Sequence, residues 1–233
     1  MIAPLRPLYA ALLLLLLFPG ACIAAPALFG FSCPESDVRE NPAFIQGYGV
    51  YWDRVVGREK EKPSFTPQGE RFNNADAAQW RNMVHYSQFS GFHDMLRMVN
   101  GYFNQWKPAA DSKAWGQDEH WATPAEFVSK RGGDCEDYAI AKYFALRHLK
   151  VPPDKMRIVI IRQRKDSGAY EKQLHAVLAV LGPSNNAETW FILDNNARPR
   201  DGITLHTQYD RRFIPLLSMN ENGAWAHCPD PAK

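Results

Sequence analysis

Apolar side chains recur at helical spacing between residues 76 and 106, where they return every three or four positions. Ser90 and Gly91 interrupt this pattern, which therefore predicts two helices that each bury one face in the core. Upstream, residues 33–75 mix aromatic side chains with Pro, Gly and Asn and show no such period. Within them, residues 60–74 are polar and predict a loop.

Two further helices carry recognisable end signals. Thr123 and Glu126 form a capping-box pattern around a proline, which predicts a short helix that ends near Lys130. After the pair Gly132-Gly133, acidic residues fill the first turn of the next segment and basic residues crowd its last turn. Because the helix dipole favours this order of charges, the segment is predicted to be a helix that ends before two consecutive prolines.

Three runs rich in Ile, Val, Leu and aromatic residues follow the helices, at 157–163, 173–181 and 190–194. Their composition and length predict β-strands, and residues 182–189 are expected to form the loop between the second and the third. Helices that come first and an antiparallel sheet that comes afterwards predict an α+β domain.

The N-terminus has the layout of a secretory signal peptide. One positive residue precedes an apolar run at 8–18, and small residues follow. Cleavage after Ala24 or Ala25 would remove a leader of residues 1–25 and leave 26–233 as a single exported domain. The alternative, a retained membrane anchor, needs about 20 apolar residues, more than this run supplies.

Four cysteines add to this picture. Cys22 follows a glycine and an alanine, so a lipoprotein anchored at Cys22 is a second interpretation of the leader. Cys33 and Cys228 lie near opposite ends of the exported chain and are each followed by proline, so a disulfide between them is a reasonable hypothesis. That pairing leaves Cys135 unpaired, as a structural free thiol or as a reactive one.

Composition and charge exclude other classes of protein. The chain has 233 residues, of which 45% are hydrophobic, enough to build a core. Its 27 basic and 25 acidic residues give a net charge of +2 and are scattered along the chain. Without a basic block to contact phosphates, nucleic acid is not expected as a partner.

Cys135 follows the glycine pair at the first turn of a predicted helix. There the free backbone N–H groups and the positive end of the dipole stabilise a thiolate, and the same amides can hold an oxyanion. The glycine pair is expected to let a substrate backbone approach closely. Cys135 is therefore the candidate nucleophile.

A thiolate also needs a base, and His175 in the second predicted strand is the candidate. If Leu181 opposes Trp190 across the expected loop, Val177 opposes Asp194. His175 and Asp194 then project from one face as diagonal neighbours, whereas a slip of one residue would separate them. Taken singly, each has a structural interpretation, as a half-buried strand histidine and as a turn former. The order Cys, His, Asp favours a catalytic triad, in which Asp194 orients and stabilises the imidazole.

Asp134, Glu136 and Asp137 surround the candidate nucleophile and should raise the pKa of its thiol. One interpretation is a bound cation with oxygen ligands, and calcium suits an exported protein. The other is an acidic helix N-terminus that simply complements the dipole. Spacing alone leaves both open.

The half of the chain that holds these residues resembles the bacterial transglutaminase-like cysteine peptidases of the LapG type, periplasmic proteases that release biofilm adhesins. The resemblance spans residues 95–196. It rests on Trp121-Ala122-Thr123-Pro124, on the string from Gly133-Asp134-Cys135-Glu136-Asp137 through Tyr143, on Leu146-Arg147 and Val151-Pro152, and on His175 and Leu193-Asp194-Asn195.

The resemblance implies a papain-like, transglutaminase-like fold with the catalytic cysteine at a helix N-terminus packed on an antiparallel sheet. It implies a triad of Cys135, His175 and Asp194, and calcium dependence with ligands at Asp134, Glu136 and Asp137. It further implies cleavage of a large adhesin near its N-terminus at a pair of alanines, and inhibition by an inner-membrane receptor for cyclic di-GMP.

Two features depart from the family pattern, an N-terminal portion at 31–74 that is longer than expected and a charged loop at 164–172. Both concern the substrate and the regulator rather than the chemistry. Two other functions remain open: a transglutaminase or amidase that uses the same cysteine chemistry, and a catalytically idle module that binds a membrane receptor.

Overall fold

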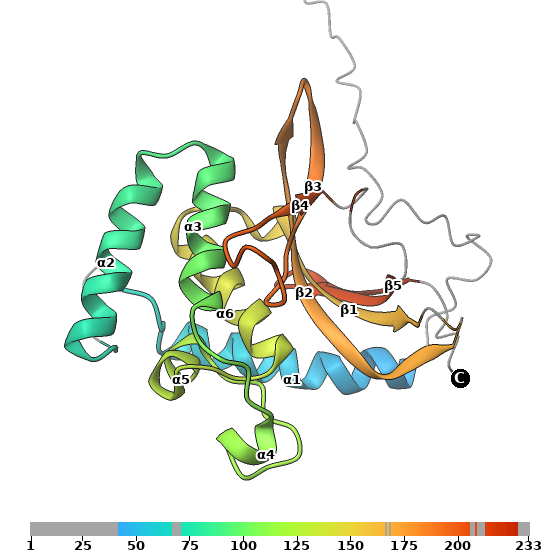
Figure 1. Ribbon diagram of the computed structural model, residues 1–233. Coiled ribbons are helices and arrows are strands. Elements are labelled where there is room, and N and C mark those ends of the chain that lie inside the picture. The colour runs from blue at the N-terminus through green and yellow to red at the C-terminus, as the bar shows by residue number, and fades with distance from the viewer. Residues whose placement is uncertain are drawn as a thin grey trace, which may run out of the picture.

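Helices pack against one face of a twisted antiparallel sheet in the computed structural model of the chain (Figure 1). The structure describes residues 42–66, 71–165, 167, 169–205, 208 and 213–227. The predicted leader, Cys22 and the Cys33–Cys228 pair lie outside the described residues.

The helices come first along the chain and the strands follow. The helices are α1 (Pro42–Glu61), α2 (Asn74–Gln88), α3 (Phe92–Asn104), α4 (Asp111–Ala114), α5 (Pro124–Lys130), α6 (Cys135–His148) and the 3₁₀ turn η3 (Pro153–Lys155). The strands are β1 (Met156–Arg164), β2 (Tyr170–Ser184), β3 (Ala187–Leu193), β4 (Thr204–Leu205), β5 (Phe213–Asn220) and β6 (Gly223–Ala226). Within the described part, the strand order is β4-β3-β2-β1-β5-β6, with every neighbour antiparallel. The α+β prediction is confirmed.

The predicted helix signals are borne out at α5 and α6. The Thr123 side chain accepts a hydrogen bond from the backbone N–H of Glu126, and the Glu126 carboxylate accepts one from the N–H of Thr123. This reciprocal capping box satisfies two of the donors that a helix start leaves free. Arg131 ends α5 in the left-handed conformation, and the chain then enters α6 at Cys135.

Helix α1 was not predicted, because its sequence contains three glycines that weaken helix propensity. Packing outweighs that cost. Trp52 is buried against Tyr143 of α6, and its indole N–H donates to the carbonyl of Asn220 at 3.0 Å. A helix stabilised by contacts this distant in sequence leaves no clear local signal.

The β2–β3 hairpin is longer than expected, so the predicted loop at 182–189 is wrong. Leu181 does oppose Trp190, as predicted, but pairing continues to Ser184 opposite Ala187. The reversal needs only two residues, and Asn185 adopts the positive φ of 50° that asparagine tolerates. Residues 182–184 and 187–189, which were predicted to lie in the loop, therefore belong to β2 and β3.

Alternate residues of the central strands supply two apolar layers. Ile158, Ile160, Leu178 and Val180 face the core shared with the helices, whereas a second cluster with Val159 and others buries the opposite face. None of the helices in the described ranges is long and apolar enough to cross a membrane.

Candidate active site

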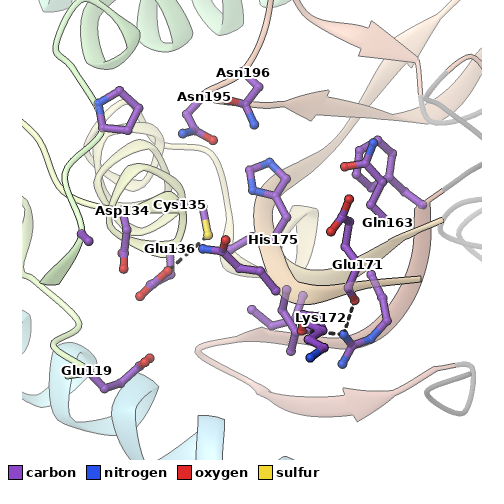
Figure 2. A pocket seen from close by; sticks show the side chains of 18 of the residues that line it. Glu119, Asp134, Cys135, Glu136, Gln163, Glu171, Lys172, His175, Asn195 and Asn196 are labelled. Carbon is purple, nitrogen blue, oxygen red and sulfur yellow. Dashed lines mark hydrogen bonds between the residues drawn. The ribbon is translucent and has the colours of Figure 1, made fainter. Parts of the chain in front are cut away.

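Cys135 is the first residue of α6 and points into the cleft between this helix and β2 (Figure 2). Its thiol donates a hydrogen bond to Oε2 of Glu136 at 3.3 Å. Burial raises the pKa of the thiol, and the carboxylates of Glu136 and Asp134 raise it further, while the backbone N–H of Ala176 acts on the sulfur in the opposite sense. The local environment by itself therefore favours the neutral thiol.

His175 and Asp194 form a hydrogen-bonded pair, with Nε2 of the imidazole 2.9 Å from Oδ1 of the carboxylate. Because a carboxylate only accepts hydrogen bonds, Nε2 carries the proton and Nδ1 is the nitrogen that can take one. The β2–β3 ladder ends with Leu178 opposite Leu193, which brings Asp194 to the position predicted for it. The predicted proximity of the two side chains is confirmed.

Asp194 is held on both sides. Its Oδ1 also accepts from the backbone N–H of Asn196 at 2.8 Å, and its backbone carbonyl accepts from Nδ2 of Asn104 at 2.8 Å. Asn104 is the last residue of α3, so this helix fixes the end of β3 beside the imidazole. Nothing in the local sequence around Asn104 suggested that role.

Cys135 and His175 line one cleft of about 980 Å³, whereas Asp194 contacts the imidazole from behind the lining. Figure 2 shows the Cys135 sulfur and the His175 ring projecting into it from α6 and β2. The walls come from segments far apart in the sequence: Tyr48 of α1, residues 108–110, and the first half of β2. The cleft is lined by a candidate nucleophile and by a histidine that a carboxylate orients, the residue types used for acyl transfer through a covalent intermediate.

Carboxylates gather beneath the N-terminus of α6, and two of them were not predicted. Oxygen atoms of Asp111, Asp134 and Asp137 lie within 4.8 Å of one another, and so do those of Asp111, Glu119 and Glu136. The three ligands predicted from the resemblance thus fall into two groups that share Asp111. Asp111 and Glu119 precede α6 by 16 residues or more, so no local spacing connected them with it.

Three oxygens in this acidic cluster, defined as Asp111, Glu119, Asp134, Glu136 and Asp137, lack a hydrogen-bond partner in the described part of the chain. They are Oδ1 of Asp111, Oδ1 of Asp134 and Oδ2 of Asp137, and all are buried. Burial raises the pKa of Asp134 to about 6 and that of Asp137 well above its ordinary value, and neighbouring carboxylates add to both shifts. Buried oxygens that repel one another fit a cation with oxygen ligands.

Comparison with known proteins identifies the chemistry. The family model for bacterial transglutaminase-like cysteine proteinases matches residues 71–232. The chain belongs to this family. The protein is therefore a cysteine peptidase with a transglutaminase-like fold, as the resemblance implied.

Solved structures of LapG from Legionella pneumophila are similar to this peptidase. The calcium-bound form is 27% identical, with a TM-score of 0.52 over 76% of this chain and 90% of that chain. The EGTA-treated form is 29% identical, with a TM-score of 0.53 over 74% of this chain and 84% of that chain. A third LapG structure is 29% identical, with a TM-score of 0.53 over 74% of this chain and 87% of that chain. A search of curated protein sequences found no match.

The two glycines before the nucleophile serve the fold of the peptidase itself. A Cβ at Gly132, whose φ is 148°, would lie 2.4 Å from the carbonyl oxygen of Lys107, and one at Gly133 would lie 2.1 Å from Oδ2 of Asp137. The backbone N–H of Ala109 also donates to the carbonyl of Gly133 at 2.8 Å. The absence of a Cβ therefore lets the backbone of Lys107 and the side chain of Asp137 lie close to these glycines. The prediction from the sequence was that a substrate backbone would approach them.

Lys142, two turns after the nucleophile on α6, is fully buried. Its ammonium has no hydrogen-bond partner in the part of the chain that the structure describes, although it lies 5.6 Å from the ring centre of Tyr138 and feels the charge of Asp194. Burial lowers the pKa of Lys142 to about 7, and Asp194 partly opposes that shift.

Lys142→Met is expected to raise the free energy of unfolding near pH 6.5 by roughly 1–4 kcal/mol, because it replaces a buried cation with an apolar side chain. The folded-state pKa of about 7 lies below the unfolded value of about 10.4, so the unfolded chain binds the extra proton between these limits. The free energy of unfolding of the parent therefore rises with pH between about 7 and 10.4. The difference in the free energy of unfolding between the variant and the parent becomes smaller over the same range. Urea unfolding at pH 6.5, 8 and 9.5 measures the difference.

The exposed Lys60 on α1 supplies the matched control for this experiment. Lys60→Met should leave both the free energy of unfolding and its pH dependence within error of the parent. If Lys142→Met retains the parent's pH slope, the buried ammonium is not its source.

Proposed function

We propose that this cysteine peptidase is a calcium-dependent endopeptidase of the periplasm, which cuts a large surface adhesin near its N-terminus and so releases biofilm. The observation that carries the proposal is an open cleft lined by Cys135 and His175, with Asp194 hydrogen-bonded to the imidazole. Next to Cys135 lies the acidic cluster, whose buried oxygens lack hydrogen-bond partners among the described residues. The similarity to LapG structures in calcium-bound and EGTA-treated forms supports the choice of metal.

The proposed reaction uses each group according to its geometry. Nδ1 of His175 takes the thiol proton, and the sulfur of Cys135 attacks the scissile carbonyl to form a tetrahedral intermediate. The backbone N–H groups at the start of α6 hold its oxyanion. The imidazolium then protonates the leaving amine, and a water molecule, activated by the same imidazole, hydrolyses the thioester. Asp194 keeps the proton on Nε2 throughout and stabilises the charged imidazole.

Calcium would be held by members of the acidic cluster, with Asp111 shared by its two groups. When bound, it supplies positive charge that offsets the carboxylates beside the nucleophile and stiffens the turn that carries it. Glu136, as a ligand, would no longer accept the thiol proton. Cys135 would then be free to donate it to His175.

Export and regulation are part of the same proposal. A leader of residues 1–25 would direct the chain to the periplasm, with a lipoprotein at Cys22 as the second possibility. There an inner-membrane receptor for cyclic di-GMP would bind the peptidase and inhibit it. Added receptor domain should protect Cys135 from alkylation if it covers the cleft.

Incubation of the purified N-terminal segment of an adhesin from the same source with the peptidase tests the proposal. Mass spectrometry should find two fragments whose masses sum to the substrate plus one water, and EGTA should suppress them. A single larger species would instead indicate a transglutaminase. An intact substrate under calcium would contradict adhesin cleavage.

A further inference from the structure

Strand β2 is paired on both edges along only part of its length. On one edge it pairs with β1 from Leu174 to Val180 and, after a register shift, again at Tyr170, whereas on the other it pairs with β3 only from Leu178 onward. Among the described strands, none pairs with this second edge between residues 170 and 177. Figure 1 shows the consequence, a long β2 that continues past the end of β3 with β1 along its other edge.

The direction of the backbone groups on this edge follows from the β2–β3 turn. Ser184 opposes Ala187 across the two-residue turn as a hydrogen-bonded pair, so the N–H and C=O of Ser184 face β3, and by alternation those of Ala176 also point away from β1. Because backbone groups alternate along a strand, Leu174 directs its N–H and C=O groups to the same side as Ala176. Before Leu174 the register with β1 shifts, and there Arg162 donates to the carbonyls of both Glu171 and Lys172, at 2.6 and 2.7 Å. The peptide groups of Leu174, about 7 Å from those of Ala176, are the next ones that a bound chain would meet.

This edge faces the catalytic cleft. Residues 171–176 of β2 line it together with Cys135 and residues 108–110. Figure 2 shows Glu171, Lys172 and His175 following one another along the wall. An extended peptide placed one strand spacing from β2 would therefore pass directly over the nucleophile.

We propose that the peptidase takes its substrate as an extended, unstructured polypeptide segment that adds to β2 as a further strand, hydrogen-bonded to the backbone of Leu174, with the scissile carbonyl at Cys135. This inference rests on the proposed endopeptidase function and specifies the conformation of its substrate. Main-chain hydrogen bonds then provide affinity, and alternate side chains of the substrate face the two walls of the cleft.

Peptide chloromethyl ketones test the inference without requiring hydrolysis, because the cysteine sulfur displaces chloride and forms a stable thioether. The probe is acetyl-tetra-alanyl chloromethyl ketone, compared with chloroacetamide and with four analogues that each carry one backbone N-methyl group. The second-order rate of Cys135 alkylation is measured with the full chain and excess calcium. The parent peptide should react faster than chloroacetamide.

N-methylation should slow alkylation about tenfold at the residues whose N–H faces β2 and less than twofold at the residues between them, since one backbone hydrogen bond is lost at every second position. A uniform effect, no effect, or a parent peptide no faster than chloroacetamide would overturn the strand model. If the alternation is found but the adhesin remains uncut, the adhesin proposal fails and the strand model stands.

A variant pair tests the protein side. Leu174→Pro removes the N–H on the free edge, where proline is tolerated, and should slow the parent peptide about tenfold. Leu174→Ala keeps that N–H and should have a smaller effect. Equal rates in the two variants would contradict a role for the Leu174 backbone, and the peptide series decides the question if the proline variant does not fold.

Discussion

Cys135→Ala should abolish cleavage of the adhesin segment while the protein stays folded. Removal of the nucleophile leaves no atom to form the thioester, and loss of a nucleophile in comparable hydrolases lowers kcat by about 10⁵ or more. The fold should persist because the small side chain of Cys135 is replaced by one of similar size and α6 keeps its other N-terminal residues. Fragment formation over hours, followed by mass spectrometry, measures the effect.

A control variant separates the loss of the nucleophile from general damage. Ser129→Ala removes a similarly small side chain from the exposed end of α5, outside the cleft, and should cleave at the parent rate. Circular dichroism and thermal unfolding should agree for both variants. Cleavage by Cys135→Ala at more than about 1% of the parent rate would refute the assignment of the nucleophile.

Asp111→Asn should weaken calcium binding at least tenfold, because Asp111 is the carboxylate common to both groups of the acidic cluster. The same change should stabilise the protein in chelator, since it removes one of several buried acids that repel one another. The melting temperature of the variant should therefore exceed that of the parent in EGTA and fall below it in calcium, where ligand binding stabilises the parent more.

Titration calorimetry and thermal unfolding in the two buffers measure this inversion. Asp118→Asn, an exposed change nearby, should show neither effect. EGTA should also slow the alkylation of Cys135 by iodoacetamide, because uncompensated carboxylates beside the sulfur disfavour the thiolate. If no calcium binds and the order of melting temperatures is the same in both buffers, the metal proposal fails.

The candidate catalytic residues were predicted from local patterns, because the interactions that place them are local. The start of α6 is marked by glycines and acids, and the central strands by their composition, so the position of Cys135 at a helix N-terminus could be inferred. The proximity of His175 and Asp194 was also predicted, since a single correct pair, Leu181 with Trp190, determines the register of the whole hairpin.

The acidic cluster was only partly predicted. The predicted members Asp134, Glu136 and Asp137 lie within two residues of Cys135 in the sequence. Asp111 and Glu119 approach it through the path of the chain after α3. The segment between α3 and α6 is largely irregular, so no repeating sequence pattern predicts which of its side chains will lie near the start of α6. Whether the predicted ligands bind calcium stays a prediction, and the structure adds Asp111 to the candidates.

By itself, the sequence determined the α+β class, the boundaries of α5 and α6, and the family to which the chain belongs, because helix caps, strand composition and the motif around Cys135 are properties of neighbouring residues. Only the tertiary structure decided that α1 is a helix, that Lys142 is buried, and that no described strand pairs with the β2 edge at the cleft. Each of these depends on which distant segments pack together, and that choice follows from the balance of burial over the whole domain rather than from any local pattern.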